Sequence, residues 1–226
     1  RYIKLDDPNN TGSLVGELER ALYEVGIQSA VMTEAGEYRL VEAISSWSRN
    51  NSIHLEVLQD YRFICTHAEF REWTEGRKQL RMEYFYRDMR RKTGLLMDGD
   101  KPEGGRWNFD AENRKPAQNS LVMQHPVRTE TDTITNEVLD LVEERFPENF
   151  GALRPFWFAV TREGALKALD AFIEHSLPSF GDFQDAMLEN QRFLFHSVLA
   201  QYINAGLLQP LEVCRKAEAA WYAGHA

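Results

Sequence analysis

The chain has 226 residues, of which 43% are hydrophobic and 12% are aromatic. This length and composition support one large or two small domains with a buried core, and they exclude a disordered chain. The formal net charge of −9 excludes a protein whose whole surface binds nucleic-acid phosphates, so any such contact has to be a local basic patch.

The sequence holds no run of about 18 apolar residues and its start lacks the layout of a secretory signal. Cys65 and Cys214 stand far apart and outside any Cys-x-x-Cys pair, which indicates neither a disulfide framework nor a thiolate metal site. We therefore expect a cytoplasmic monomer that contacts no membrane.

The first third of the chain alternates strand and helix patterns. Alternation predicts strands at residues 1–5, 27–32 and 53–58, and apolar residues at helical spacing predict helices at 14–25, ending at Gly26, and at 38–47. Strands joined by helical connections have to be parallel, which predicts an α/β sheet covered on both faces. A sheet that begins at residue 1 is expected to lack its earlier strands.

From residue 66 onward the pattern changes from alternating strands and helices to helices and one long polar loop. Thr66-His67-Ala68-Glu69 matches a capping box and opens a helix, and residues 78–92 predict another helix. Residues 94–128 are rich in Gly, Pro, Asn and Asp, which predicts a functional loop that is also a domain linker. Three helical faces follow, at 138–146, 166–173 and 194–202, and predict the opening of an all-α domain.

The loop is dense in polar groups. Asp98 and Asp100 are hard oxygen ligands that could hold a divalent cation, Trp107 offers a stacking face, and Arg106 and Arg114 could bind phosphate. The alternative is that these groups form turns and salt bridges that stiffen the loop. The spacing excludes an EF-hand and a Walker loop.

The string Gly-Gly-Arg-Trp-Asn-Phe-Asp-Ala-Glu-Asn-Arg-Lys-Pro at 104–116 closely resembles the deoxyribodipyrimidine photolyase-related family of bacterial iron–sulfur photolyases and cryptochromes. The resemblance extends to 4–12 and 180–187 and covers essentially the whole chain. It implies a Rossmann-like, truncated antenna domain over 1–96, an interdomain loop and linker helix over 97–155, and the start of an all-α FAD-binding domain over 156–226.

The same resemblance implies a light-dependent lyase that repairs (6-4) pyrimidine photoproducts in UV-damaged DNA by electron transfer from reduced FAD. The alternative is a cryptochrome-like blue-light photoreceptor without repair activity. A 4Fe-4S cluster and a lumazine-type antenna pigment are implied for the full-length parent, with the cluster ligands outside this chain. We assign no catalytic residue within the chain and expect the fragment alone to be inactive.

The resemblance also implies cofactor contacts. A segment that wraps the FAD phosphates in photolyases aligns with residues 196–200, although Ala200 stands where Ser is usual and Gln201 where Pro is usual. Phe183 lies near the place of an aromatic that packs on the flavin nucleotide, with a core aromatic as the alternative. The candidate cofactor-binding residues are Phe183, Asp185, His196, Ser197, Val198, Leu199 and Ala200.

The sequence has two other sets of polar residues, a basic run and scattered histidines. The basic run 87–92 could meet DNA phosphates, the acidic loop that follows it, or only solvent. His67, His125, His175 and His225 show neither helical pairing nor the motif of a hydrolase or metalloprotease, so they are assigned no chemistry.

Overall fold

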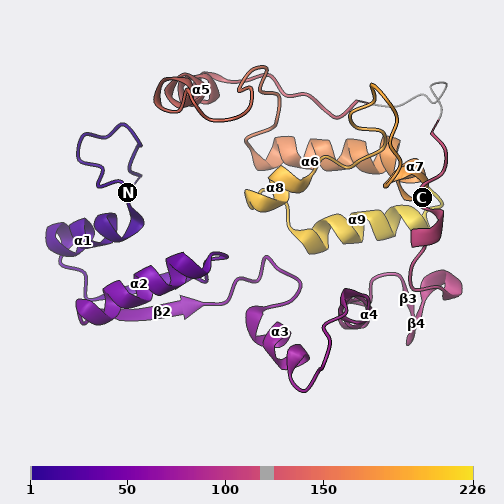
Figure 1. The fold of residues 1–226 in the computed structure, drawn as a ribbon, viewed down its shortest axis with the longest axis horizontal. Coiled ribbons are helices and arrows are strands. Elements are labelled where there is room, and N and C mark those ends of the chain that lie inside the picture. Colours follow the sequence, from indigo (N-terminus) through magenta and orange to yellow (C-terminus); the bar gives the residue numbers. More distant parts are fainter. Residues whose placement is uncertain (1, 118–124, 226) are drawn as a thin grey trace. The chain divides into compact units, whose positions relative to one another are not determined.

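The computed structural model describes residues 2–117 and 125–225 (Figure 1). The chain divides into two compact units, the first formed by residues 1–61 and 66–70 and the second by residues 62–65 and 71–226. None of the helices in the described ranges is long and apolar enough to cross a membrane. The predicted division into antenna-type domain, linker and flavin-binding domain stays a prediction.

The first unit is a small α/β layer. Its elements are α1 (Leu14–Val25), β1 (Ser29–Thr33), α2 (Tyr38–Asn50) and β2 (His54–Leu58), and α3 (His67–Thr74) begins in it. β1 and β2 pair in parallel from Ser29↔His54 to Thr33↔Leu58, with α2 as the crossover. α2 buries Ile44 and Trp47. The α/β prediction is confirmed in this coarse form, whereas the Rossmann-like detail stays a prediction.

The predicted strand at the start of the chain is wrong for the residues described there, because residues 2–5 are irregular. The carbonyl oxygen of Lys4 accepts hydrogen bonds from the backbone amide of Asp7 at 3.2 Å and from Nδ2 of Asn10 at 2.9 Å. These turn contacts bend the segment back on itself, and turn chemistry therefore overrides the polar–apolar alternation.

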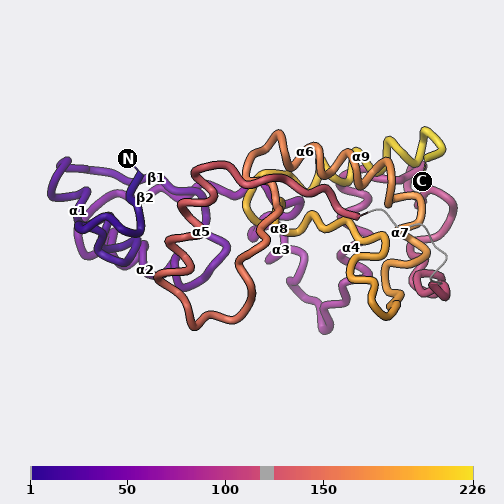
Figure 2. The backbone as a smooth tube through the Cα atoms, turned by 90° about the horizontal axis from the view of Figure 1, so that it is seen from above, coloured from indigo at the N-terminus to yellow at the C-terminus, as the bar shows by residue number. Residues whose placement is uncertain are grey.

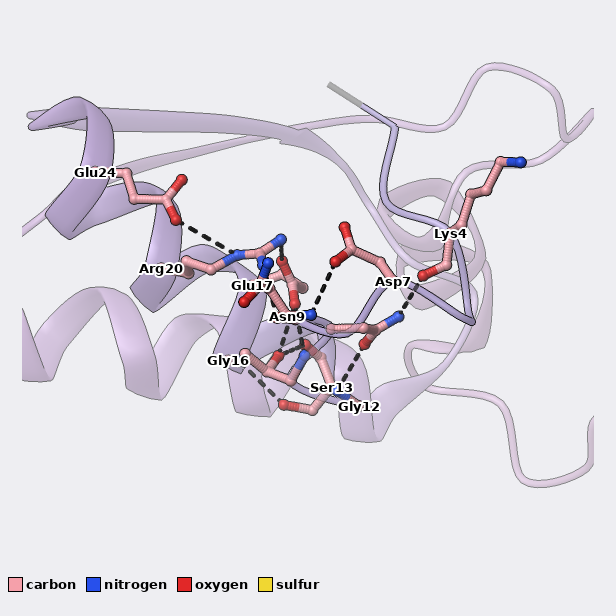
Figure 3. Close-up of polar contacts among 11 residues, drawn as sticks. Lys4, Asp7, Asn9, Gly12, Ser13, Gly16, Glu17, Arg20 and Glu24 are labelled. Carbon is pink, nitrogen blue, oxygen red and sulfur yellow. Dashed lines mark hydrogen bonds and ion pairs between the residues drawn. The ribbon is translucent and has the colours of Figure 1, made fainter.

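The turn is fastened to the first turn of α1 (Figure 3). Ser13 Oγ accepts the amide of Gly16 as the helix N-cap, and Glu17 Oε1 accepts the amide of Thr11 at 2.8 Å. Arg20 pairs with Glu17 at 2.6 Å and donates to the carbonyl oxygen of Asn9, also at 2.6 Å. The polar string at residues 4–12 is thus a folded cap on α1.

The second unit is mostly helical. Its elements are α4 (Met82–Thr93), a hairpin of β3 (Met97–Asp98) and β4 (Lys101–Pro102), 3-10 turns at Glu103–Gly105 and Asp110–Glu112, α5 (Thr133–Arg145), α6 (Arg162–Ala171), a π turn (Phe172–Ser176), α7 (Leu177–Phe183), α8 (Ala200–Asn204) and α9 (Pro210–Tyr222). Helices α4, α5 and α6 begin within a few residues of the predicted positions, because local periodicity and capping residues set them. Helix α9 was not among the helices predicted from the sequence.

Helices α6 and α9 lie side by side in both views (Figures 1 and 2). Ion pairs join them at both ends, from Arg162 to Glu212 at 2.7 Å and from Lys216 to Asp170. Beneath these ion pairs lies one apolar cluster, which consists of Ala159, Ala165, Leu169, Phe172, Leu199, Tyr202 and Leu208. This core fixes the ends of the segments that carry the predicted cofactor residues.

The helix predicted across residues 194–202 is wrong in its first half. Only α8 is helical there, and Leu194 and Val198 have φ angles of 42° and 50°, which an α-helix cannot contain. Leu194, Leu199 and Tyr202 are nevertheless buried. The spacing of apolar residues therefore indicated which side chains are buried, but it did not indicate a helical backbone.

Candidate functional site

The loop string at residues 104–116 is bound to the segment that follows α7. The backbone amide of Lys115 donates to Asp182 O at 2.9 Å, and that of Asp185 donates to Asn113 O at 3.2 Å. Lys115 Nζ pairs with the Asp182 carboxylate at 2.8 Å, and Asp185 Oδ2 lies 3.2 Å from Asn113 Nδ2 and 3.3 Å from Arg114 Nη2. These five residues form the loop clamp.

The loop clamp joins two residues that the sequence placed in different roles. Arg114, predicted to bind phosphate, is the ion-pair partner of Asp185, predicted to contact the cofactor. The Arg114 side chain keeps 75% of its surface exposed, so the pairing does not bury it. Both predicted roles stay predictions, and the clamp gives both residues a structural contact.

The two predicted cofactor segments meet in the structure. The rings of Phe183 and Phe195 are tilted against each other with centroids 5.4 Å apart. His196 Nε2 lies 2.9 Å from the carbonyl oxygen of Gln184. A carbonyl oxygen can only accept, so Nε2 carries the proton and the imidazole is held against the turn after α7.

A small cavity of about 30 Å³ lies beside this junction, lined in part by Ser197 and Val198. Three histidines from separate segments also line it, namely His125, His175 and His196. The π turn between α6 and α7 carries His175, and such turns are frequent at functional sites. Sequence reasoning missed His125 and His175, because only the fold brings them beside His196.

This cavity tests whether the described residues fit a flavin. A space of about 30 Å³ holds about one water molecule, whereas a ligand of cofactor size needs several hundred. The Leu199 side chain is only 2% exposed and lies in the apolar core, so it cannot reach a ligand. The described residues at this junction therefore do not enclose a pocket of cofactor size, and the predicted FAD contacts stay predictions.

A larger groove of about 770 Å³ runs along α4 and the loop string. Its lining includes the aromatic ring of Trp107 and the guanidinium of Arg90, but also the carboxylates of Glu83, Glu103 and Asp110. A hydrogen bond from Arg87 lowers the pKa of Glu83 below its ordinary value. The negative charge of this lining disfavours a phosphate ligand.

The basic run on α4 faces inward, toward the loop. The guanidinium carbons of Arg87, Arg90 and Arg91 lie 5.2, 5.7 and 4.7 Å from the ring centroid of Trp107. Tyr86 donates its hydroxyl to the carbonyl oxygen of Trp107 at 2.9 Å, and Arg90 donates to that hydroxyl at 3.0 Å. Of the three interpretations of the basic run at 87–92, the structure thus supports contact with the loop that follows it.

The remaining loop residues lie apart from these contacts. Asp98 is opposite Lys101 in the β3–β4 hairpin, and Asp100 is in its turn. The described residues contain no group of three or more His, Cys, Asp or Glu side chains placed to hold a metal ion, so the predicted cation at Asp98 and Asp100 has no third ligand there. Arg106 pairs with Glu112 at 2.6 Å and packs over Phe109.

The two cysteines are free thiols, and burial, followed by the charge of Glu218, raises the pKa of Cys214. A thiol with a raised pKa is a poor nucleophile at neutral pH, so the structure offers no reactive cysteine at this position.

Comparison with known proteins supports the family resemblance that the loop string indicates. The sequence profile of the deoxyribodipyrimidine photo-lyase-related protein family matches residues 1–158. Along its whole length the chain is 51% identical to a protein of Agrobacterium fabrum named (6-4) photolyase, of which the match covers 45%. A protein of Acanthamoeba polyphaga mimivirus without a described function is 28% identical over 89 residues, which is 38% of this chain and 45% of that relative.

The chain thus spans less than half the length of either of these curated relatives. The family profile nevertheless covers well over half of the chain and includes the loop string at residues 104–116. On this evidence the chain belongs to the family of deoxyribodipyrimidine photo-lyase-related proteins.

Proposed function

We propose that the protein carrying this chain is a light-dependent DNA photolyase that repairs (6-4) pyrimidine photoproducts by electron transfer from reduced FAD. The observation that carries the proposal is the 51% identity to a relative named (6-4) photolyase, which extends over the whole chain and so includes both segments predicted to contact the cofactor. Light absorption and electron donation are chemistry that reduced FAD supplies when bound, and the protein's part is to hold cofactor and DNA.

His196 and Ser197 are the side chains that we propose to contact FAD most directly. The His196 ring is exposed and is oriented by its hydrogen bond to Gln184, and the Ser197 hydroxyl is half-buried beside it. Phe183 and Asp185 lie at the same junction. Val198, Leu199 and Ala200 would contribute backbone contacts, since the Leu199 side chain lies in the core.

The other components belong to the proposal for the whole protein. Arg106 and Arg114 expose 50% and 75% of their side chains and would contact phosphates of UV-damaged DNA at the loop. We propose a 4Fe-4S cluster and a lumazine-type antenna for the full-length protein, with the cluster ligands outside this chain.

The direct test of function uses the full-length protein with its flavin reduced. An oligonucleotide with one (6-4) photoproduct is illuminated with the protein, and reversal to intact pyrimidines is measured against a dark control and against an oligonucleotide with a cyclobutane dimer. Light-dependent reversal of the (6-4) lesion is expected. Normal flavin photoreduction without reversal would contradict the proposal and favour a photoreceptor.

The site assignment is tested by flavin retention. His196→Ala and Ser197→Ala should lower the FAD-to-protein ratio after gel filtration, because each removes a polar contact. His54→Ala is the matched control, since His54 is an exposed histidine on β2 of the other unit. Equal flavin content in all three variants would remove His196 and Ser197 from the site.

A further inference from the structure

A groove of about 450 Å³ in the second unit has a composition unlike that of the rest of the chain. Among the described residues its lining contains no carboxylate, although the chain as a whole has 35 acidic and 26 basic residues. The lining does contain three arginines, Arg128, Arg154 and Arg192, together with His125. In a chain of net charge −9, such a surface is a local site of positive potential.

Three segments that are distant in sequence build this groove. The backbone amide of Thr129 donates to the carbonyl oxygen of Trp157 at 2.9 Å, which holds Arg128 beside the Trp157 ring. Arg192 follows a tight turn in which the amide of Gln191 donates to Leu188 O at 3.1 Å. The groove is therefore defined by tertiary contacts and not by one loop.

The arginines differ in how far their charge is compensated. Arg154 pairs with Asp140 at 2.5 Å and also donates to Asn136, so it is a fixed and neutralised edge of the groove. No carboxylate in the described part of the chain pairs with Arg128 or Arg192, and both side chains are exposed. These two guanidinium groups are thus free to bind an anion in bidentate geometry.

The groove also offers aromatic surface. The rings of Trp157 and Phe193 meet edge to face with centroids 5.9 Å apart, and the Arg128 guanidinium lies 5.7 Å from the Trp157 centroid. Trp157 is half-buried, so only part of its indole faces the groove. Uncompensated arginines beside an accessible indole surface are a combination with which proteins bind a phosphate and stack the adjoining base. The groove is open and its cations are exposed, which suits a strand that runs through it better than a small ligand enclosed by its pocket.

We propose that the groove of Arg128, Trp157, Arg192 and Phe193 binds an unpaired stretch of a nucleic-acid strand, with phosphates on the two arginines and a base on the aromatic pair. The choice of DNA as that strand rests on the proposed function, whereas the groove itself does not. No residue of this groove was among the phosphate-binding residues predicted from the sequence.

The test measures binding of a fluorescent twelve-nucleotide oligothymidylate to the protein carrying the chain, by anisotropy in 0.1 M salt. The variant Arg128→Ala/Arg192→Ala is compared with Arg145→Ala/Arg215→Ala, which removes the same charge from exposed arginines on α5 and α9. Each lost phosphate contact in a single strand should weaken binding about five-fold at this salt, so about 25-fold is expected for the groove variant.

The salt dependence gives a second readout. The slope of log K against log salt concentration should fall by about 1.4 in the groove variant and stay unchanged in the control. A groove variant that binds within about three-fold of the control, with the same slope, overturns the proposal. Retained circular dichroism in both variants is expected, because neither Arg128 nor Arg192 holds an ion pair in the described fold.

Two further probes test whether a base stacks in the groove and whether the ligand is a strand. An abasic oligonucleotide of equal length should bind at least about five-fold more weakly than oligothymidylate, because it cannot stack; equal binding would overturn the role of Trp157 and Phe193. The groove variant can also be tested for ADP binding. If it loses ADP binding but keeps its affinity for oligothymidylate, the groove binds a free nucleotide and the proposal of a bound strand is wrong.

The outcome also separates this proposal from the proposed function. If the wild-type protein reverses the lesion in light and the groove variant still binds DNA like the control, only the groove proposal fails. If the groove variant loses oligothymidylate binding and the wild-type protein never reverses a lesion, the groove is supported and the repair proposal fails.

Discussion

Asp185 should act first as a structural partner of Asn113, and Asp185→Ala tests this. The Asn113 side chain is buried at 6% exposure, its Oδ1 already has no hydrogen-bond partner, and its Nδ2 bonds only to Asp185 Oδ2 in the described contacts. Removing the carboxylate leaves a buried amide unsatisfied, which costs about 1–3 kcal/mol. The ion pair from Asp185 to the largely exposed Arg114 adds no more than about 1 kcal/mol.

The assay is hydrogen–deuterium exchange in the full-length protein, because it reports the local opening of the loop clamp without global unfolding. The amides of Lys115 and Asp185 both bond across the clamp. Since 1.4 kcal/mol corresponds to about ten-fold, Asp185→Ala should speed their exchange at least about five-fold. Arg114→Ala should speed it less, because it leaves Asn113 paired.

Lys115→Ala is the control, since it removes an exposed ion pair to Asp182 but leaves the backbone bond between the same residues. If Asp185→Ala exchanges no faster than Arg114→Ala, the buried amide does not dominate and the reasoning is refuted. A loss of FAD in Asp185→Ala without faster exchange would instead support direct contact between Asp185 and the cofactor.

Three other outcomes are expected. Leu169→Ala should lower the free energy of unfolding by about 2–5 kcal/mol in a urea titration, since Leu169 is fully buried, whereas Leu14→Ala at a 57% exposed position should change it by less than about 0.5 kcal/mol. Gly26→Ala should cost about 1 kcal/mol because its φ is 69°, and Gly36→Ala, where no positive φ or close neighbour is present, should cost nothing measurable in the same titration. The hydrogen bond from the Thr11 amide lowers the pKa of Glu17. The stability that the Glu17 charge contributes is therefore present above the ordinary value of 4.5 and is lost as the pH falls through the folded pKa. Glu17→Gln should thus be less stable than wild type at pH 7, and the difference should disappear in acid.

The elements that the sequence predicted well carry their own local signals. Helix α1 ends at Gly26 because that residue takes the left-handed conformation, and α3 begins after Thr66, whose hydroxyl accepts the Glu69 amide while the Glu69 carboxylate accepts the Thr66 amide. Caps and periodicity act within a few residues, so they can be read from one stretch of sequence. The parallel pairing of β1 and β2 followed from the helix between them.

The parts that sequence reasoning missed depend on distant contacts. Arg114 and Asp185 pair across 71 positions, and no local pattern marks either residue as the partner of the other. His125 and His175 reach the same cavity as His196 only through the fold. Leu194 is buried although its φ angle is positive, as is that of Val198, so tertiary burial of apolar side chains overrode the helical pattern of this segment.

The two grooves of the second unit explain where a chain of net charge −9 can meet a polyanion. Beside the groove of Trp107, Arg87 and Arg91 lie against the Trp107 ring and are paired with Glu83 and Asp88, so their charge is compensated within the protein. Conservative replacement there should disturb folding before it disturbs phosphate binding.

In the groove of Trp157, Arg128 and Arg192 have no such acids among the described residues, and their charge is available to a ligand. Composition alone required that any nucleic-acid contact be a local basic patch. The number of arginines does not locate the strand-binding groove that we propose, since α4 has more of them. That groove lies where two arginines have no carboxylate partner among the described residues.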